Sequence, residues 1–285
     1  MNTIAIWGAG ELGAALARRL ADHERARCVY LVDADVKRAR GKALDILQGC
    51  PVEGSDTRVE GASNLAECGP CDVVVLADPG GDETGATPAE LAAVAPSLGQ
   101  AVLLVAVARP VPLVAAAVGC GRARERVVAS VPLAWAARLQ RLAARELNVS
   151  SAAVGVSVMG LPPDDLFIPH GGLLLGGSNT DEHSPTLRRR LLAAAGRRGL
   201  GPVALAAAAE RVLRALAAPR ADVLSLGVWL DGEYGQRRIL LAVPTRIGDG
   251  VVKPALEAPL APVDRVALAA AADRAAAAGA TPARG

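Results

Sequence analysis

The sequence is poor in aromatic side chains, in lysine and in net charge. Aromatic residues make up 2% of its 285 residues, and lysine occurs only at positions 37, 42 and 253. The formal net charge is +2, and no aromatic residue is interleaved with the arginines at 188–190 and 197–198. Surfaces that bind single-stranded nucleic acid combine clustered cations with aromatic stacking platforms. We therefore predict no nucleic-acid partner, and we interpret these arginines as the solvated face of one helix.

Long apolar runs are also missing. Hydrophobic residues make up 52% of the chain, but charged residues, glycine or proline interrupt the apolar stretches. Every such stretch is well short of the roughly 20 residues that a membrane span requires. The N-terminal residues have an apolar strand pattern, without the charged leader and apolar segment of a secretion signal. We expect no membrane partner, no signal peptide and a cytoplasmic location.

Cysteine is scattered rather than clustered. Five cysteines occur, at positions 28, 50, 68, 71 and 120. Cys68 and Cys71 have the spacing of a redox dithiol or of half a zinc site, but they precede a predicted strand instead of opening a helix. No second pair lies nearby. An ordinary turn with two thiols is the favoured interpretation, redox or metal chemistry is the alternative, and we predict no metal site.

The features that the sequence does contain are concentrated at its N-terminus. A β-prone run, Thr3 to Trp7, leads into Gly8-Ala9-Gly10-Glu11-Leu12-Gly13, and a helical pattern follows at once. In such a turn Gly8 permits the tight bend, Gly10 lets the backbone approach a pyrophosphate, and Gly13 lets helix and strand pack closely. The free N–H groups at the start of the helix then face the phosphates. These residues predict a dinucleotide-binding site.

An acidic residue completes this pattern. The apolar run 28–32 ends in Asp33, twenty positions after Gly13. An acid at this place accepts hydrogen bonds from the adenosine ribose of NAD and repels the 2′-phosphate of NADP. Ala34 offers no cation to offset that repulsion, whereas Lys37 and Arg38 would weaken the preference if they turned back toward the ribose. We predict that the cofactor is NAD.

The order of predicted elements divides the chain in two. Up to residue 132, apolar strands alternate with helices, as is typical of a doubly wound parallel sheet. Beyond it we expect helices at 133–147, 185–198, 205–217 and 262–278, and strands near 152–159, 171–175, 223–230 and 237–243. The predicted fold is α/β, with a Rossmann dinucleotide-binding domain over residues 1–132. A smaller α+β domain for substrate binding or oligomerisation is predicted over residues 133–285.

Motifs along nearly the whole chain resemble the NAD-dependent lactate and malate dehydrogenases, particularly the malate enzymes that are similar to lactate dehydrogenase. The matching segments are Gly8–Gly13, Leu31–Asp35, Gly41–Ile46, Val228–Gly235 and Val243–Pro244. The resemblance implies a two-domain oxidoreductase, usually a homodimer or homotetramer, that transfers hydride between a nicotinamide and a 2-hydroxy acid. It assigns cofactor binding to Gly8, Gly10, Glu11, Leu12, Gly13, Asp33, Ala77 and Arg109.

The positions at which the family keeps its catalytic groups hold other residues here. Arg138 matches the arginine that clamps the substrate carboxylate through two parallel hydrogen bonds. Pro162 stands at the position of the catalytic histidine, and Trp135 stands at the position of the aspartate that orients it. Arg109 takes the place of an asparagine that contacts cofactor and substrate. The resemblance therefore implies a site for a small carboxylate at Arg138 but leaves the catalytic residues unknown.

The loop after the strand at 73–77 departs from the family in the same way. Members of the family carry arginines there that polarise the substrate carbonyl, but residues 78–88 contain none. Asp78, Asp82 and Glu83 make this loop acidic instead. Anionic substrates would be repelled by these carboxylates.

Proton exchange with the substrate oxygen needs a group that titrates near neutrality, which proline cannot supply. For the three histidines, His23, His170 and His183, surface or structural roles are favoured, with His170 the least certain. Conceivable substitutes are Asp164, Asp165 and Tyr234. We predict that ordinary lactate or malate dehydrogenase activity is weak or absent. Two alternatives stay open: an oxidoreductase with another substrate and proton donor, and a non-catalytic NAD sensor or assembly subunit.

Overall fold

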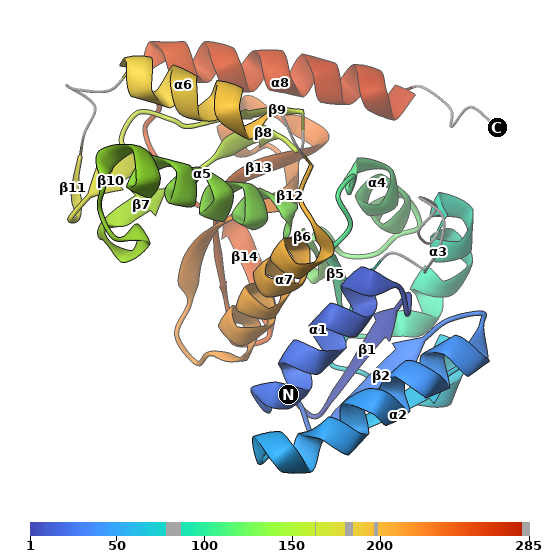
Figure 1. The fold of residues 1–285 in the computed structure, drawn as a ribbon. Helices are drawn as coiled ribbons and strands as arrows, with labels where there is room; N and C mark the ends of the chain where they lie inside the picture. The colour runs from blue at the N-terminus through green and yellow to red at the C-terminus, as the bar shows by residue number, and fades with distance from the viewer. Residues whose placement is uncertain (78–86, 163, 180–184, 197–198, 281–285) are drawn as a thin grey trace.

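The computed structural model describes residues 1–77, 87–162, 164–179, 185–196 and 199–280 (Figure 1). In its first half, parallel strands alternate with helices. The strands are β1 (Thr3–Trp7), β2 (Cys28–Val32), β3 (Arg58–Ala62), β4 (Val73–Leu76), β5 (Val102–Val105) and β6 (Val127–Ala129). The helices are α1 (Glu11–Asp22), α2 (Val36–Glu53), α3 (Pro88–Val94) and α4 (Val111–Gly119).

These six strands pair in the order β3-β2-β1-β4-β5-β6, all parallel. This is the strand order of a doubly wound dinucleotide-binding sheet, so the predicted fold class is confirmed. Every residue of β4 and of β5 is buried, as expected for central strands that helices cover on both faces. In such a sheet, ligands bind beyond the carboxyl ends of the strands.

The second half contributes antiparallel strands and further helices. The strands are β7 (Val154–Val156), β8 (Met159–Leu161), β9 (Asp165–Phe167), β10 (Leu173–Leu175), β11 (Ser178–Asn179), β12 (Asp222–Asp231), β13 (Arg237–Gly248) and β14 (Val251–Ala255). The helices are α5 (Val131–Leu147), α6 (Pro185–Ala195), α7 (Pro202–Ala217) and α8 (Pro262–Ala280). Short 3-10 turns, including η3 (Arg124–Arg126), η4 (Ser151–Ala153) and η6 (Glu233–Gly235), connect several of these elements.

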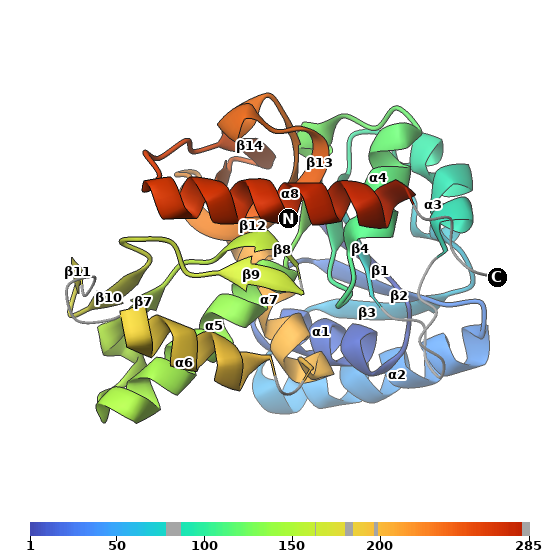
Figure 2. The same cartoon turned by 90° about the horizontal axis from the view of Figure 1, so that it is seen from above.

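The main sheet continues from the first half into the second. Strand β12 pairs with β6 through Gly227 and Ala129, and the order then runs β12-β13-β8-β9, with β14 beside β13. Strands β11, β10 and β7 form a separate small sheet. Helix α8 crosses β8, β9 and β13, and its C-terminal end reaches α4 (Figure 2). The boundary predicted between residues 132 and 133 falls in the first turn of α5 and stays a prediction.

Two predictions about the second half were wrong. One strand was expected near 152–159. The structure instead has η4, then β7 in the small sheet, then β8 in the main sheet. The chain changes sheet at Ser157, which donates its N–H to Gly172 O at 2.8 Å, and Val158, which donates to Ser225 Oγ at 3.1 Å. The arginines of α6 do not all face solvent, because Arg188 is buried. Arg197 and Arg198 lie outside the described residues.

Helices α1 and α7 join the two halves of the chain, and Figure 1 shows them side by side. Glu210 of α7 is buried between them and binds three basic side chains of the first half, Arg19, His23 and Arg25. The helix that carries the glycine turn is therefore anchored to the second half by charge as well as by apolar packing. In the part of the chain that the structure describes, no helix has the length and apolarity to cross a membrane.

Candidate functional site

The glycine turn between β1 and α1 has the close packing that its sequence predicts. Gly8 adopts φ 117°, a region that favours glycine, and donates its N–H to Val32 O at 2.8 Å. A Cβ on Gly13 would lie 1.8 Å from Gly8 O, so only glycine fits at this crossing of helix and turn. The turn therefore brings the start of α1 to the carboxyl end of β1.

The first turn of α1 is suited to an anion. Its N-cap residue is Gly10, which has no side chain to cap the N-terminal N–H groups. The first α-helical bond runs from Ala14 N to Gly10 O at 3.1 Å. Glu11 is exposed, whereas Leu12 is buried in the core behind the turn. A helix N-terminus with uncapped N–H groups and the positive end of its dipole fits a pyrophosphate.

Asp33 follows β2 and lies against this turn. Its side chain is 2% exposed, and its Oδ2 accepts the Ala9 N–H at 2.9 Å. Its Oδ1 accepts the Asp35 N–H at 2.9 Å and Arg38 Nη2 at 2.7 Å. Burial opposes ionisation of the carboxyl, but these hydrogen bonds outweigh burial and hold the pKa of Asp33 below its usual value. The acid is thus a fixed, charged acceptor at the edge of the glycine turn.

Lys42 also holds the turn, a role that the sequence interpretation did not assign. Its Nζ donates to Ala9 O at 2.8 Å and to Gly10 O at 3.0 Å, reaching across from α2. The ammonium group satisfies two backbone carbonyls of the glycine turn and places a positive charge beside it. The sequence signal for this role is the position of Lys42 within Gly41–Ile46, a segment that matches the family.

Two further predicted residues, Ala77 and Arg109, follow neighbouring parallel strands and therefore lie at the same sheet edge, together with Ser130, which the sequence interpretation did not single out. Ala77 follows β4, is fully buried and donates its N–H to Trp7 O at 2.9 Å. Arg109 follows β5 and precedes α4. Ser130, which directly follows β6, is fully buried, and its hydroxyl has no hydrogen-bond partner among the described residues. The carboxyl edge of the sheet is thus formed by the glycine turn, Ala77 and these two loops.

Arg138 and Trp135 lie together on α5. The guanidinium of Arg138 is 5.2 Å from the centre of the Trp135 ring, a cation–π distance, and its Nη1 donates to Gly199 O at 3.1 Å. The indole nitrogen of Trp135 is buried without a hydrogen-bond partner in the described ranges. Pro162, directly after β8, is buried as well. The two positions that the family uses for an aspartate and a histidine therefore hold no titratable group.

The candidate substitutes for the missing histidine have other partners. Asp164 forms an ion pair at 3.1 Å with Arg109, which joins the loop after β8 to the loop after β5. Asp165 pairs with Arg274 of α8. The Tyr234 hydroxyl donates to Leu256 O at 2.6 Å, and burial raises its pKa. Of the three, Asp164 is the one that contacts a predicted site residue.

The histidines bind carboxylates in structural roles. His23 Nδ1 lies 2.6 Å from Glu210 in the α1–α7 contact. His170 donates its N–H to Asp264 Oδ2 at 2.9 Å, and its Nδ1 lies 3.1 Å from the same atom at the start of α8. Neither pair includes a residue of the predicted cofactor or substrate site. His183 and the acidic residues Asp78, Asp82 and Glu83 lie outside the described residues.

The thiols of Cys68 and Cys71 precede β4, at the sheet edge opposite the glycine turn. Burial raises the pKa of Cys68 to about 12, and burial raises the pKa of Cys71 as well. Thiols that stay protonated are weak nucleophiles and weak metal ligands. All five cysteines are free, and no cluster of three metal-binding side chains occurs within the described residues.

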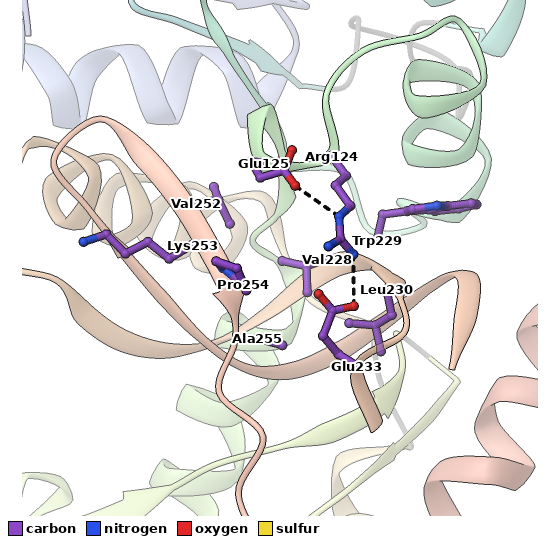
Figure 3. Close-up of a pocket in the computed structure, with 10 residues that line it drawn as sticks. All are labelled: Arg124, Glu125, Val228, Trp229, Leu230, Glu233, Val252, Lys253, Pro254 and Ala255. Atoms are coloured by element: carbon purple, nitrogen blue, oxygen red, sulfur yellow. Dashed lines mark hydrogen bonds and ion pairs between the residues drawn. The ribbon is translucent and has the colours of Figure 1, made fainter. Parts of the chain in front are cut away.

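A small pocket lies at that opposite edge as well (Figure 3). Arg124, just before β6, donates to Glu233 at 3.0 Å and to Glu125 at 3.1 Å inside it. The Glu233 ion pair fixes η6, the turn within the family-like segment Val228–Gly235. The pocket lies at the amino ends of the parallel strands, so we assign it a structural role rather than a catalytic one.

The strand order, the glycine turn and the buried acid after β2 are those of a Rossmann-type fold of the dehydrogenase class. No protein-family model matches the chain. It is 30% identical over 284 residues to a malate dehydrogenase of Dehalococcoides mccartyi, covering 91% of this chain and 92% of that one. It is 28% identical over 294 residues to the malate dehydrogenase of Chloroherpeton thalassium, with 95% of each chain covered.

Solved structures agree with these sequence relationships. The malate dehydrogenase of Salinibacter ruber superposes with a TM-score of 0.85 at 24% identity, covering 97% of this chain and 96% of that chain. The minor L-lactate dehydrogenase of Enterococcus mundtii superposes with a TM-score of 0.81 at 18% identity and the same coverage. The chain belongs to the lactate/malate dehydrogenase family, and the resemblance noted in its sequence is confirmed.

Proposed function

We propose that the chain binds NAD(H) at the glycine turn and Asp33 but does not catalyse the ordinary reaction of lactate and malate dehydrogenases at a substantial rate. The uncapped N–H groups of α1 would hold the pyrophosphate. The fixed carboxylate of Asp33 would accept from the adenosine ribose. Bound nicotinamide would donate or accept hydride. The observation that carries the proposal is that the glycine turn and Asp33 have the geometry of a nucleotide site, whereas Pro162 and Trp135 stand at the positions of the family's histidine and aspartate.

The loss of activity follows from the proton that the reaction must move. A positioned general acid or base contributes about a hundredfold to ten-thousandfold to the rate, and a buried proline contributes nothing. The indole N–H of Trp135 donates but does not titrate near neutrality. Each lost donor to a developing oxyanion costs roughly 3–4 kcal/mol, and the family's loop arginines have no counterpart between residues 78 and 88.

A carboxylate site at Arg138 is compatible with this loss. A guanidinium binds a carboxylate through charge and two parallel hydrogen bonds, and neither interaction requires a titrating neighbour. The Arg138 guanidinium lies over the Trp135 ring and donates to Gly199 O, and both contacts position it on α5. We therefore propose a small carboxylate as the second ligand, bound after the nucleotide.

We also propose that the chain is a homo-oligomer, a homodimer or homotetramer. Helix α2 carries exposed apolar side chains, Leu44, Leu47 and Val52, which the described part of the chain leaves uncovered. Leu44 and Leu47 lie one turn apart on the same face of α2, and exposed apolar residues that gather on one face are typical of interaction sites. Light scattering on the purified chain tests this proposal, and a monomer at micromolar concentration would contradict it.

One observation favours an active alternative, an oxidoreductase with a changed proton donor. Asp164 lies two positions after Pro162 and pairs with Arg109 at the same sheet edge. A carboxyl group in this loop is the titratable group nearest in sequence to the lost histidine. In this alternative, Asp164→Asn would abolish a measurable NAD-dependent activity while leaving NADH binding unchanged.

The proposed function is tested by measuring binding and turnover on the same preparation. NADH titration by fluorescence should give saturable binding, and steady-state assays with oxaloacetate or pyruvate should give almost no NADH oxidation. Pro162→His alone should not restore turnover, because Trp135 cannot orient the new imidazole. A wild-type turnover on the order of 10 per second, typical of enzymes, would refute the proposed loss of activity. Failure to bind NADH would refute the nucleotide site.

A further inference from the structure

Arg38 binds Asp33, the carboxylate that is predicted to accept hydrogen bonds from the adenosine ribose. It lies in the first turn of α2, and its Nη2 is 2.7 Å from Asp33 Oδ1. The guanidinium is 32% exposed, so it forms the solvent-facing edge of an otherwise buried carboxylate. Its Nη1 lies 3.9 Å from Asp35, which also caps the Arg38 N–H at 3.1 Å. Arg38 has thus turned back toward the predicted ribose site.

The hydrogen-bonding capacity of Asp33 makes Arg38 a competitor of the ribose. A carboxylate has about four acceptor sites. Three of them are used by the Ala9 N–H, the Asp35 N–H and Arg38. Two ribose hydroxyls therefore need more sites than the carboxylate has left. Since the backbone donors are fixed by the glycine turn and by the start of α2, the guanidinium is the partner that can move.

The same pairing removes the usual reason for rejecting NADP. Asp33 selects NAD because its negative charge repels a 2′-phosphate, but the pair with Arg38 is neutral as a unit. A guanidinium also binds phosphate through parallel hydrogen bonds, for which its planar fork is suited. The exposed Lys37 and the N-terminal end of the α2 dipole add positive potential at the same place.

We propose that Arg38 is a specificity-determining residue and that the site accepts NADP(H) as well as NAD(H). When NADH binds, the Arg38 side chain moves away from Asp33, and the ribose hydroxyls donate to the carboxylate in its place. With NADPH, it pairs with the 2′-phosphate. This inference rests on the proposed nucleotide site. It revises the strict preference for NAD that Asp33 and Ala34 alone would predict.

The first test compares the dissociation constants of NADH and NADPH for the wild-type chain, measured by fluorescence at one ionic strength. The expected ratio is within about tenfold. A wild-type chain that binds NADH but binds NADPH more than about a hundredfold less tightly would overturn the inference and leave the proposed function intact. A chain that binds neither nucleotide would overturn the proposed function itself.

The second test uses Arg38→Ala, with Arg40→Ala as the matched control because Arg40 is an exposed arginine on the same helix. Arg38→Ala should weaken NADPH binding by about ten- to a hundredfold, the range of a charge-assisted hydrogen bond. NADH binding should be unchanged or tighter, because the competitor of the ribose is gone. Arg40→Ala should change both constants equally and slightly.

Arg38→Lys distinguishes the effect of the positive charge at this position from the effect of the planar guanidinium. It keeps the positive charge but lacks the two parallel N–H donors of a guanidinium, so its NADPH affinity should lie between those of wild type and Arg38→Ala. Equal losses of NADH and NADPH affinity in Arg38→Ala would show that the residue only holds the loop, which would overturn its role in specificity. Because the wild-type ratio needs no variant, the inference stays testable if a substitution impairs folding.

Discussion

Glu210 offers the sharpest test of how the two halves of the chain are held together. Its Oε2 accepts from Arg19 Nη2 at 2.6 Å, and its Oε1 contacts His23 Nδ1 at 2.6 Å and Arg25 Nε at 3.1 Å. The carboxylate is 7% exposed and lies between α1 and α7. Glu210→Ala would remove the one anion that these three side chains share, so we expect the contact between the halves to weaken.

The free energy of unfolding that Glu210→Ala should lose lies between two known limits. Breaking a buried ion pair by removing one partner costs roughly 3–5 kcal/mol, whereas an exposed pair contributes about 0–1 kcal/mol. Here the acid is buried, but its three partners are each about a third or more exposed and can be rehydrated. We therefore expect Glu210→Ala to cost about 2–3 kcal/mol, or roughly 4–9 °C in Tm for a chain of this size.

The pH dependence provides a second readout with a fixed sign. Burial opposes ionisation of Glu210, but hydrogen bonds from His23, Arg19 and Arg25 outweigh it and lower the pKa of the carboxyl. A lowered folded-state pKa gives stability that is present above the unfolded value, near 4.3. This contribution is lost as the pH falls through the folded-state pKa. The stability difference between wild type and Glu210→Gln should therefore shrink below about pH 4.

Urea unfolding followed by circular dichroism measures both effects. Glu53→Gln is the control, because Glu53 pairs with Arg18 at 3.7 Å and both side chains are exposed. We expect this control to change the free energy of unfolding by less than about 1 kcal/mol at any pH. If Glu210→Ala cost no more than Glu53→Gln, the idea that Glu210 anchors α1 to α7 would be wrong.

Two further predictions concern the ligands. Gly13→Ala should abolish NADH binding and destabilise the chain by at least about 1–3 kcal/mol, because the new Cβ would meet Gly8 O. Gly49→Ala, in the interior of α2 with open space around its Cβ, should instead be neutral or stabilising in the same melting assay. Oxamate should raise the Tm of the wild-type NADH complex. The shift should disappear in Arg138→Ala and persist in Arg141→Ala, whose arginine is exposed on the same helix; an equal shift in both variants would remove Arg138 from the site.

The nucleotide-binding half was predictable because its signals are local. An apolar run, a glycine turn and a helical pattern follow one another between Thr3 and Asp22. Asp33 stands at the spacing that one strand–helix–strand unit imposes. Each prediction depends on neighbours in the chain, and the parallel sheet then follows from the alternation of strands and helices.

The remaining features depend on contacts between distant residues, which no local pattern encodes. The Arg109–Asp164 pair joins loops 55 residues apart, and Glu210 meets Arg19 across 191 residues. The strand expected near 152–159 failed for the same reason. Its β-prone run shows no break in sequence, but Ser157 donates its N–H to Gly172 O and Val158 donates to Ser225 Oγ, which splits the run between two sheets. Arg38 was noted as a residue that could turn back, yet only the structure brings it to Asp33.

Trp135 and Pro162 pack against the protein interior, and this makes an aspartate and a histidine costly to introduce at these positions. Trp135 packs against two separate apolar clusters and supports the Arg138 guanidinium, while Pro162 is buried beside β8. Truncating a fully buried tryptophan costs about 3–5 kcal/mol, which is an upper limit for Trp135 because its side chain is partly buried. In Trp135→Asp, the new carboxylate would also have to be desolvated.

We therefore expect Trp135→Asp to lower the free energy of unfolding by about 3–5 kcal/mol, and Trp135→Phe by much less, as measured by urea unfolding. Trp135→Asp combined with Pro162→His should remain inactive toward oxaloacetate and pyruvate. The substrate loop still lacks its arginines, and groups that act as a unit do not restore activity one at a time. A stable, active double variant would show that the site retained its catalytic geometry, and that Trp135 and Pro162 were the only obstacles to the family's reaction.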